Sequence, residues 1–113
     1  MKAIGGNIVG QLQIKNGFTK NAIGERVPNW ETVHELTGFL DYQAGDSQYQ
    51  NYNAKIQEST HVFICDFVEL GSAVKAENSR FIIKGERYDV ILIDDPMELH
   101  YQLEIYLKYT GVQ

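Results

Sequence analysis

The stretch YQLEIYLKY at residues 101–109 alternates in a strict period of two. Tyr101, Leu103, Ile105, Leu107 and Tyr109 fall on one side, and the intervening side chains fall on the other. Successive side chains of a β-strand point to opposite faces of a sheet, so this pattern is typical of a strand with one buried face. It is the clearest strand signal in the chain, and it favours a β fold.

Further segments predict strands. Residues 11–19 alternate with a small irregularity, residues 60–70 are rich in β-branched and aromatic side chains, and residues 79–95 contain two strands joined at Lys84-Gly85-Glu86. Residues 27–42 are ambiguous because their apolar spacing is closer to a helical period, and we interpret them as a strand with a turn or bulge near Gly38.

About six strands without a long helix predict an all-β fold, a small antiparallel β-barrel or sandwich. The length of 113 residues suits one domain over residues 1–113, with residues 1–15 as an N-terminal arm and the start of the first strand. No apolar run approaches the ~20 residues of a membrane span, and no signal peptide is evident. Cys65 is the single cysteine, so the chain needs no oxidising compartment and we expect it in the cytoplasm.

The charge balance limits the partners. The formal net charge is −5, and no cationic cluster is denser than KNGFTK at residues 15–20. Tight binding to nucleic acid needs concentrated positive charge along the phosphates, so we do not expect it here.

No residue pattern points to catalysis. Gly5, Gly6 and Gly10 do not fit a nucleotide-binding glycine motif, and a mobile N-terminal arm explains them better. His61 and Cys65 are four residues apart on a strand, ~13 Å, which is too far to share a proton or a metal directly. Cys65 is therefore interpreted as a buried free cysteine.

The remaining polar candidates are equally weak. His34 and His100 have no companions at metal-ligand spacing, and Asp94-Asp95-Pro96 is typical of a turn because adjacent carboxylates on a strand point to opposite faces. The sequence therefore predicts that the protein is not an enzyme and that it has no cofactor and no metal.

The stretch DYQAGDSQYQNYNAK at residues 41–55 holds three tyrosines but no Val, Ile, Leu, Met or Phe. Few of its side chains can anchor it in a core, so we interpret it as a long loop after the second strand. Tyrosine supplies contact area and a hydroxyl at modest entropic cost, which is typical of segments that meet a partner. The composition alone fits an ordinary surface loop equally well.

The order of these elements resembles the head–tail joining family, the head-completion or stopper proteins of long-tailed phages. The resemblance covers residues 16–111: a glycine turn, a tryptophan, a strand leading into a long loop, an Arg-apolar-x-x-x-Gly-x-x-Tyr-x-apolar hairpin, and an Asp-Pro turn before the last strand. The residues that carry it are Gly24, Trp30, Arg80, Phe81, Gly85, Tyr88, Val90, Asp95 and Pro96.

The resemblance implies a structural protein built on a small β-barrel. Members of this family assemble as a ring, typically a dodecamer, beneath the portal and its adaptor once DNA packaging ends. They close the channel and present a surface to the tail. The implied partners are the portal and adaptor proteins and a tail-completion protein, in the bacterial host cytoplasm during assembly and then in the virion neck.

The resemblance also implies a role for the long loop. In the stopper proteins this loop reaches into the channel and joins its neighbours there, and an acidic chain fits a channel through which DNA must slide. The residues to which the resemblance assigns this subunit-interface role are Asp41, Tyr42, Gln43, Asp46, Tyr49, Asn51 and Tyr52.

Two other interpretations stay open. The chain fits a tail-completion or tail-terminator protein of the same virion, since these also form rings with β-rich cores. It also fits an oligonucleotide-binding β-barrel in which Phe18, Tyr42, Tyr49 and Tyr52 stack on single-stranded bases, although such a domain usually offers a basic groove.

Overall fold

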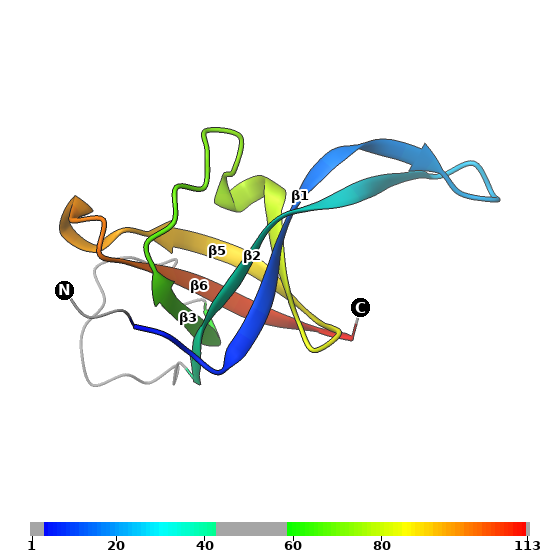
Figure 1. The fold of residues 1–113 in the computed structure, drawn as a ribbon. Helices are drawn as coiled ribbons and strands as arrows, with labels where there is room; N and C mark the ends of the chain where they lie inside the picture. The colour runs from blue at the N-terminus through cyan, green and yellow to red at the C-terminus, as the bar shows by residue number, and fades with distance from the viewer. Residues whose placement is uncertain (1–3, 43–58, 113) are drawn as a thin grey trace.

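The computed structural model describes residues 4–42 and 59–112. Six antiparallel strands form one sheet that closes into a barrel in the order β1-β2-β3-β6-β5-β4 (Figure 1). They are β1 (Ile8–Lys20), β2 (Arg26–Tyr42), β3 (His61–Asp66), β4 (Ser79–Ile83), β5 (Glu86–Asp94) and β6 (Gln102–Val112), with short 3-10 helices η1 (Ala76–Asn78) and η2 (Pro96–Glu98) in two connections. The predicted all-β barrel of about six strands is confirmed.

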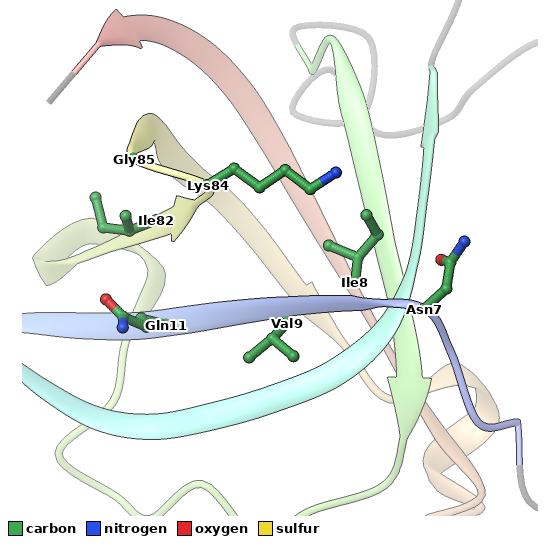
Figure 2. Close-up of a pocket in the computed structure, with 7 residues that line it drawn as sticks. All are labelled: Asn7, Ile8, Val9, Gln11, Ile82, Lys84 and Gly85. Atoms are coloured by element: carbon green, nitrogen blue, oxygen red, sulfur yellow. The ribbon is translucent and has the colours of Figure 1, made fainter.

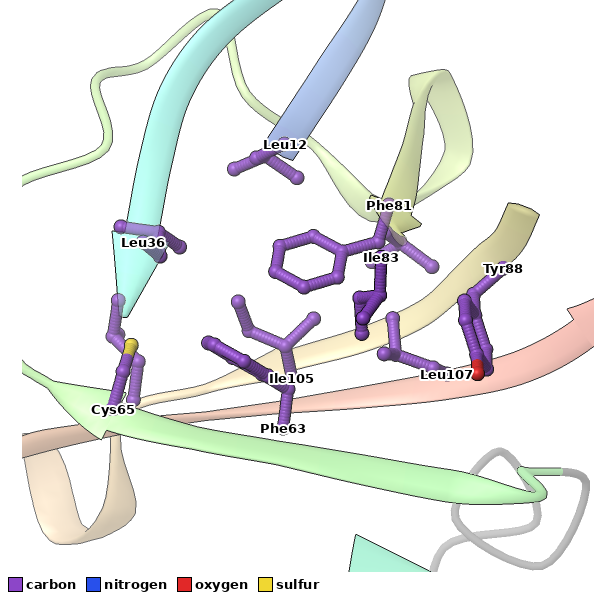
Figure 3. Packing of buried hydrophobic residues seen from close by; sticks show 11 residues of the cluster. Leu12, Leu36, Phe63, Cys65, Phe81, Ile83, Tyr88, Ile105 and Leu107 are labelled. Atoms are coloured by element: carbon purple, nitrogen blue, oxygen red, sulfur yellow. The ribbon is translucent and has the colours of Figure 1, made fainter. Parts of the chain in front are cut away.

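Alternating side chains from all six strands fill the barrel. Phe63 and Phe81 lie at its centre with ring centroids 4.8 Å apart, and both are fully buried (Figure 3). The strict alternation of residues 101–109 holds in the middle of β6, where three side chains point inward: Leu103, Ile105 and Leu107. The ends of that stretch are exposed, since Tyr101 and Tyr109 keep 52% and 41% of their surface accessible. In the described ranges no helix has the length and apolar character needed to cross a membrane.

The predicted hairpin between β4 and β5 is confirmed. Its two connecting residues, Lys84 and Gly85, both have positive φ angles, of 52° and 79°. Two successive positive φ angles match the right-handed twist of the flanking strands, and glycine adopts this conformation without strain. The hairpin places Phe81 directly opposite Tyr88 inside the barrel.

The first two strands are much longer than the barrel needs. β4 pairs with β1 over Gly10–Ile14, and β3 pairs with β2 over Gly38–Tyr42. Residues 15–30 pair only with each other and Glu31 pairs with Ile14, and residues 15–31 project from the barrel as a two-stranded arm (Figure 1). We call residues 15–31 the arm. The sequence predicted both strands and the turn between them, but not that they continue beyond the barrel.

Two bulges shape the β1–β2 hairpin. The register shifts at Val33, which is an extra residue in β2, and again at Asn16-Gly17 in β1. Bulges bend a strand and increase its twist, so these two sites direct the arm away from the barrel. The bulge was expected near Gly38. That position is instead regularly paired on both sides, with Ile8 and with Cys65.

The N-terminal segment before β1 is hydrogen-bonded to the barrel, whereas the sequence predicted that it is mobile. β1 begins at Ile8, and the backbone amides of Ile4 and Gly5 donate hydrogen bonds to the carboxylate of Asp66, at 2.7 and 3.3 Å. The amide of Asn7 donates to the carbonyl of Gly38 at 3.1 Å. From residue 4 onward, this segment is tied to the barrel at the end where β2 and β3 meet.

Candidate functional site

The predicted channel loop lies almost wholly outside the described residues. Of its interface residues, Gln43, Asp46, Tyr49, Asn51 and Tyr52 are not described. The other two, Asp41 and Tyr42, are the last residues of strand β2 and do not belong to a loop. They pair with Val62 and His61 of β3. These two residues mark the place where the chain leaves the barrel.

A row of aromatic rings begins at that place. Tyr42 packs edge-on against His61, which packs against Tyr88, which packs against Tyr109, with centroid separations of 5.5, 5.3 and 5.3 Å. We call these four side chains the aromatic row. Tyr42 is 73% exposed, Tyr88 is buried and Tyr109 is 41% exposed, so the row crosses one end of the barrel and reaches solvent at both of its ends. The row unites residues from four strands, and their separate positions in the sequence gave no sign of it.

Burial disfavours the charged forms of the two inner members of the row, His61 and Tyr88. Burial lowers the pKa of His61, and the nearby carboxylate of Glu86 opposes that effect only in part. Burial likewise raises the pKa of the Tyr88 hydroxyl, with smaller contributions from Glu86 and Tyr109. The imidazole is packed between two tyrosine rings, and its Nδ1 lies 2.8 Å from the hydroxyl of Thr60, which also accepts a hydrogen bond from the amide of Tyr109 at 2.8 Å.

The motif residues that carry the phage resemblance form a contact of their own. The guanidinium of Arg80 lies over the ring of Trp30, 4.4 Å from the centroid, and Nε of Arg80 donates to Oε1 of Gln13 at 2.7 Å. The ammonium of Lys15 lies over the same indole at 5.8 Å. Trp30 and Arg80 therefore join the root of the arm to β4, although fifty residues separate them in sequence.

The other motif residues lie in turns and in the core. Gly85 is at the tight turn of the β4–β5 hairpin, and Tyr88 is in the core. Asp95 and Pro96 form the turn after β5, where Pro96 begins η2 and the carboxylate of Asp95 accepts a hydrogen bond from the amide of His100 at 3.0 Å. The predicted turn at Asp94-Asp95-Pro96 is confirmed.

Three of the polar residues considered for catalysis, Cys65, His34 and His100, have defined surroundings in the structure. Cys65 is buried in the barrel, and burial together with the charge of Asp66 raises its pKa to about 11. Nε2 of His34 is bonded to the carbonyl of Leu70, and Nδ1 of His100 contacts Asp95. Among residues 4–42 and 59–112, no group of three or more His, Cys, Asp and Glu side chains is arranged to hold a metal ion.

The surface hollows are open and shallow. One lies outside the barrel where β1 meets the β4–β5 turn, lined by Val9, Gln11, Ile82 and Lys84 among others (Figure 2). Figure 2 shows these side chains spread along the two strands rather than converging on a point. The lining of this hollow contains one ionisable side chain, that of Lys84. Acid–base or nucleophilic catalysis needs two cooperating polar side chains, and this hollow has no second ionisable one.

The proposed stacking platform for single-stranded bases is not assembled from its described members. Phe18 and Tyr42 lie at opposite ends of the β1–β2 hairpin: Phe18 pairs with Pro28, fourteen residues before Tyr42, or about 45 Å along an extended strand. One face of the Phe18 ring is also covered, because the guanidinium of Arg26 lies 4.8 Å from its centroid.

On the arm, exposed apolar side chains lie next to cationic side chains. Phe18 and Val27 keep 57% and 42% of their surface accessible, and Ile23 at the tip keeps 79%. Lys20 and Arg26 pair directly across the arm. An apolar surface with adjacent positive charge on a projecting hairpin is suited to contact another macromolecule.

Comparison with known proteins finds no family model that matches this sequence and no curated protein with significant similarity to it.

Proposed function

We propose that this chain is a structural protein of a phage neck, a head-completion or stopper protein. It binds beneath the portal and adaptor as part of a ring, closes the DNA exit channel after packaging and provides the surface to which the tail attaches. The support is the resemblance carried by residues 16–111, together with a closed six-stranded barrel of the kind that the resemblance implies.

The observation that carries the proposal is the contact between Trp30 and Arg80. These are the two most distinctive residues of the motif, and they stack at 4.4 Å across two strands that are distant in sequence. A chance match of short motifs gives no reason for its members to touch. Here the tryptophan before the loop and the arginine of the hairpin form one structural unit at the root of the arm.

A structural role also agrees with what the described residues lack. No group of three or more of their His, Cys, Asp and Glu side chains is arranged to hold a metal ion, and the hollow where β1 meets the β4–β5 turn has no converging polar groups. Their conspicuous surfaces are instead the aromatic row, the arm and the rim where Asp41 and Tyr42 lead into the undescribed residues 43–58. Each of these is suited to bind other subunits rather than a small substrate.

The test uses heads from the phage or prophage that encodes this chain, with the gene deleted. Such heads should release their DNA and become sensitive to nuclease. Purified protein added to the lysate should protect the packaged DNA and restore infectious particles when tails are supplied. Nuclease-sensitive heads that remain so after addition of the protein would contradict the proposal.

A loop variant sharpens the test. Replacing residues 46–51 by a Gly-Ser linker should leave the thermal midpoint nearly unchanged, because this stretch has no aliphatic side chain that could enter the core. It should nevertheless give heads that leak DNA or fail to accept tails. The matched control replaces the exposed Ser72-Ala73 by Gly-Ser and should complete heads normally. Normal particle yield from the loop variant would mean that this stretch is only a surface loop.

A further inference from the structure

Two cross-strand pairs of like charge lie on the surface of this protein, and they have opposite sign. Lys20 of β1 is directly opposite Arg26 of β2 on the arm, and Asp94 of β5 is directly opposite Glu104 of β6 on the barrel. Like charges directly opposite one another in an antiparallel pair destabilise the sheet. Each pair is therefore an unfavourable local choice that a complementary partner would relieve.

Neither pair is neutralised within the described part of the chain. The salt bridge found there joins His100 and Asp95, and it involves none of these four residues. Glu104 accepts hydrogen bonds from Gln102 and from the hydroxyl of Tyr106, which are neutral donors. The pKa of Asp94 is raised, first by burial and then by the charges of Glu104 and Asp95.

The cationic pair shares its face of the arm with apolar side chains. Phe18 lies opposite Pro28, two residues from Lys20 and Arg26 on each strand, so all four point to one side. The packing of Arg26 over the Phe18 ring confirms this orientation. We call Phe18, Lys20, Arg26 and Pro28 the arm face.

The anionic pair also has apolar neighbours. Leu92 lies opposite Tyr106, and Ile64 of β3 lies opposite Glu104, so these residues share the outer surface of the sheet with Asp94. Leu92, Tyr106 and Ile64 are each half-buried. We call Ile64, Leu92, Asp94, Glu104 and Tyr106 the acidic face.

The two faces are opposite in charge. The same division holds for the whole molecule, because the arm is positively charged and the rest of the chain is negatively charged. The arm, residues 15–31, holds three Lys or Arg and two Asp or Glu, which gives it a charge of +1. Because the net charge of the chain is −5, the remaining residues sum to −6. The two acids of the arm, Glu25 and Glu31, accept side-chain hydrogen bonds from Asn21 and Asn16. The cations of the arm face are left to meet an anionic surface elsewhere.

The arm face cannot reach the acidic face of its own chain. The arm projects from one end of the barrel, whereas β5 and β6 carry the acidic face close to η2 at the opposite end (Figure 1). We propose that the arm face of one copy docks on the acidic face of a second copy. The contact is head-to-tail, and repetition of such a contact generates a ring if the rotation closes and a filament if it does not.

This inference rests on the proposed function only for its setting, because a neck ring needs a subunit contact of this kind. The contact itself is derived from side chains of this chain, so it is tested with the purified protein and without heads or tails. It can fail while head completion stands, and it can hold if head completion fails.

The first experiment is zero-length carbodiimide coupling of an equal mixture of ¹⁴N and ¹⁵N protein at millimolar concentration and low salt. We expect mixed-isotope peptides that join Lys20 to Asp94 or Glu104. Lys20→Arg keeps the charge but removes the amine, so it should abolish these peptides. Lys15→Arg is the matched control and should leave them unchanged. Absence of mixed-isotope peptides between Lys20 and residues 94–104 would overturn the proposal.

The second experiment exchanges the charges. Lys20→Glu/Arg26→Glu and Asp94→Lys/Glu104→Lys should each associate at least tenfold more weakly than the natural protein in sedimentation velocity. Their equimolar mixture should recover association, because each variant then offers the charge that the other lacks. Circular dichroism of each variant verifies that it is folded. A mixture that stays as dissociated as its components would overturn the proposal, even if single variants are weakened.

Discussion

The charge of Asp94 is unfavourable in the folded protein. It faces Glu104 across the sheet and is next to Asp95, and burial adds to the cost of its ionised form, so its pKa is raised above the ordinary value of 3.8. A carboxyl with a raised folded-state pKa binds its proton more tightly in the folded state. Its contribution to stability is complete below about pH 3.8 and is lost as the pH rises through the raised pKa.

Asp94→Asn should therefore raise the free energy of unfolding at pH 7 by about 0.5–1 kcal/mol, the scale of one cross-strand charge pair. The gain should vanish near pH 3, where the carboxyl of the natural protein is protonated. Urea unfolding at the two pH values measures this. Asp89→Asn is the control: Asp89 faces Lys108, so it should give no gain. An Asp94→Asn protein that is no more stable than the natural one at pH 7 would show that the repulsion is negligible.

Cys65 should be chemically silent in the folded protein. It is 2% exposed, and its pKa of about 11 leaves very little thiolate at neutral pH, which is the reactive form. At pH 8 a disulfide-exchange reagent should label Cys65 at least a hundredfold more slowly than a cysteine introduced at the exposed Thr37, and at an ordinary rate in guanidinium. Rapid labelling without denaturant would mean that β3 opens readily.

At the scale of elements, Gly38 holds two strands and the N-terminal segment at close range. A Cβ at this position would lie 2.2 Å from the carbonyl oxygen of Ile64, and one at Gly6 would lie 2.3 Å from the Gly38 backbone. Gly38→Ala should therefore separate β2 from β3 and lower the free energy of unfolding by about 1–3 kcal/mol, as overpacking does. Thr37→Ala, at the adjacent exposed position, is the control. A stable Gly38→Ala protein would mean that β3 moves aside easily.

The strands were predictable because alternation is a local property. β6 and the β4–β5 hairpin follow directly from the period of two and from Gly85. The arm was not predictable in the same way. Its departure from the barrel depends on bulges at Val33 and Asn16-Gly17 and on where β3 and β4 stop pairing, and these are long-range features of register.

At the scale of the whole molecule, the candidate surfaces depend on which strands are neighbours. The aromatic row and the acidic face each join residues from strands that the barrel order brings together, and Tyr42, His61, Tyr88 and Tyr109 are unremarkable one by one. The sequence led to the motif residues Trp30 and Arg80, but their contact required the closed sheet. The channel role that the resemblance assigns to the loop at residues 41–55 stays a prediction, because all of that loop except Asp41 and Tyr42 lies outside the described residues.

The segregation of charge also limits binding to nucleic acid. The arm offers three cations, Lys15, Lys20 and Arg26, and the remainder of the chain is strongly acidic. Three contacts to single-stranded DNA give a slope of log K against log salt of about −2, since each neutralised phosphate contributes about −0.7. Binding of a labelled oligonucleotide at physiological salt, followed by fluorescence anisotropy, should therefore be weak and no steeper than this. Lys20→Glu/Arg26→Glu should abolish what binding there is. Submicromolar binding with a steeper slope would favour the oligonucleotide-binding barrel, because a larger set of phosphate contacts than the arm supplies would then be required.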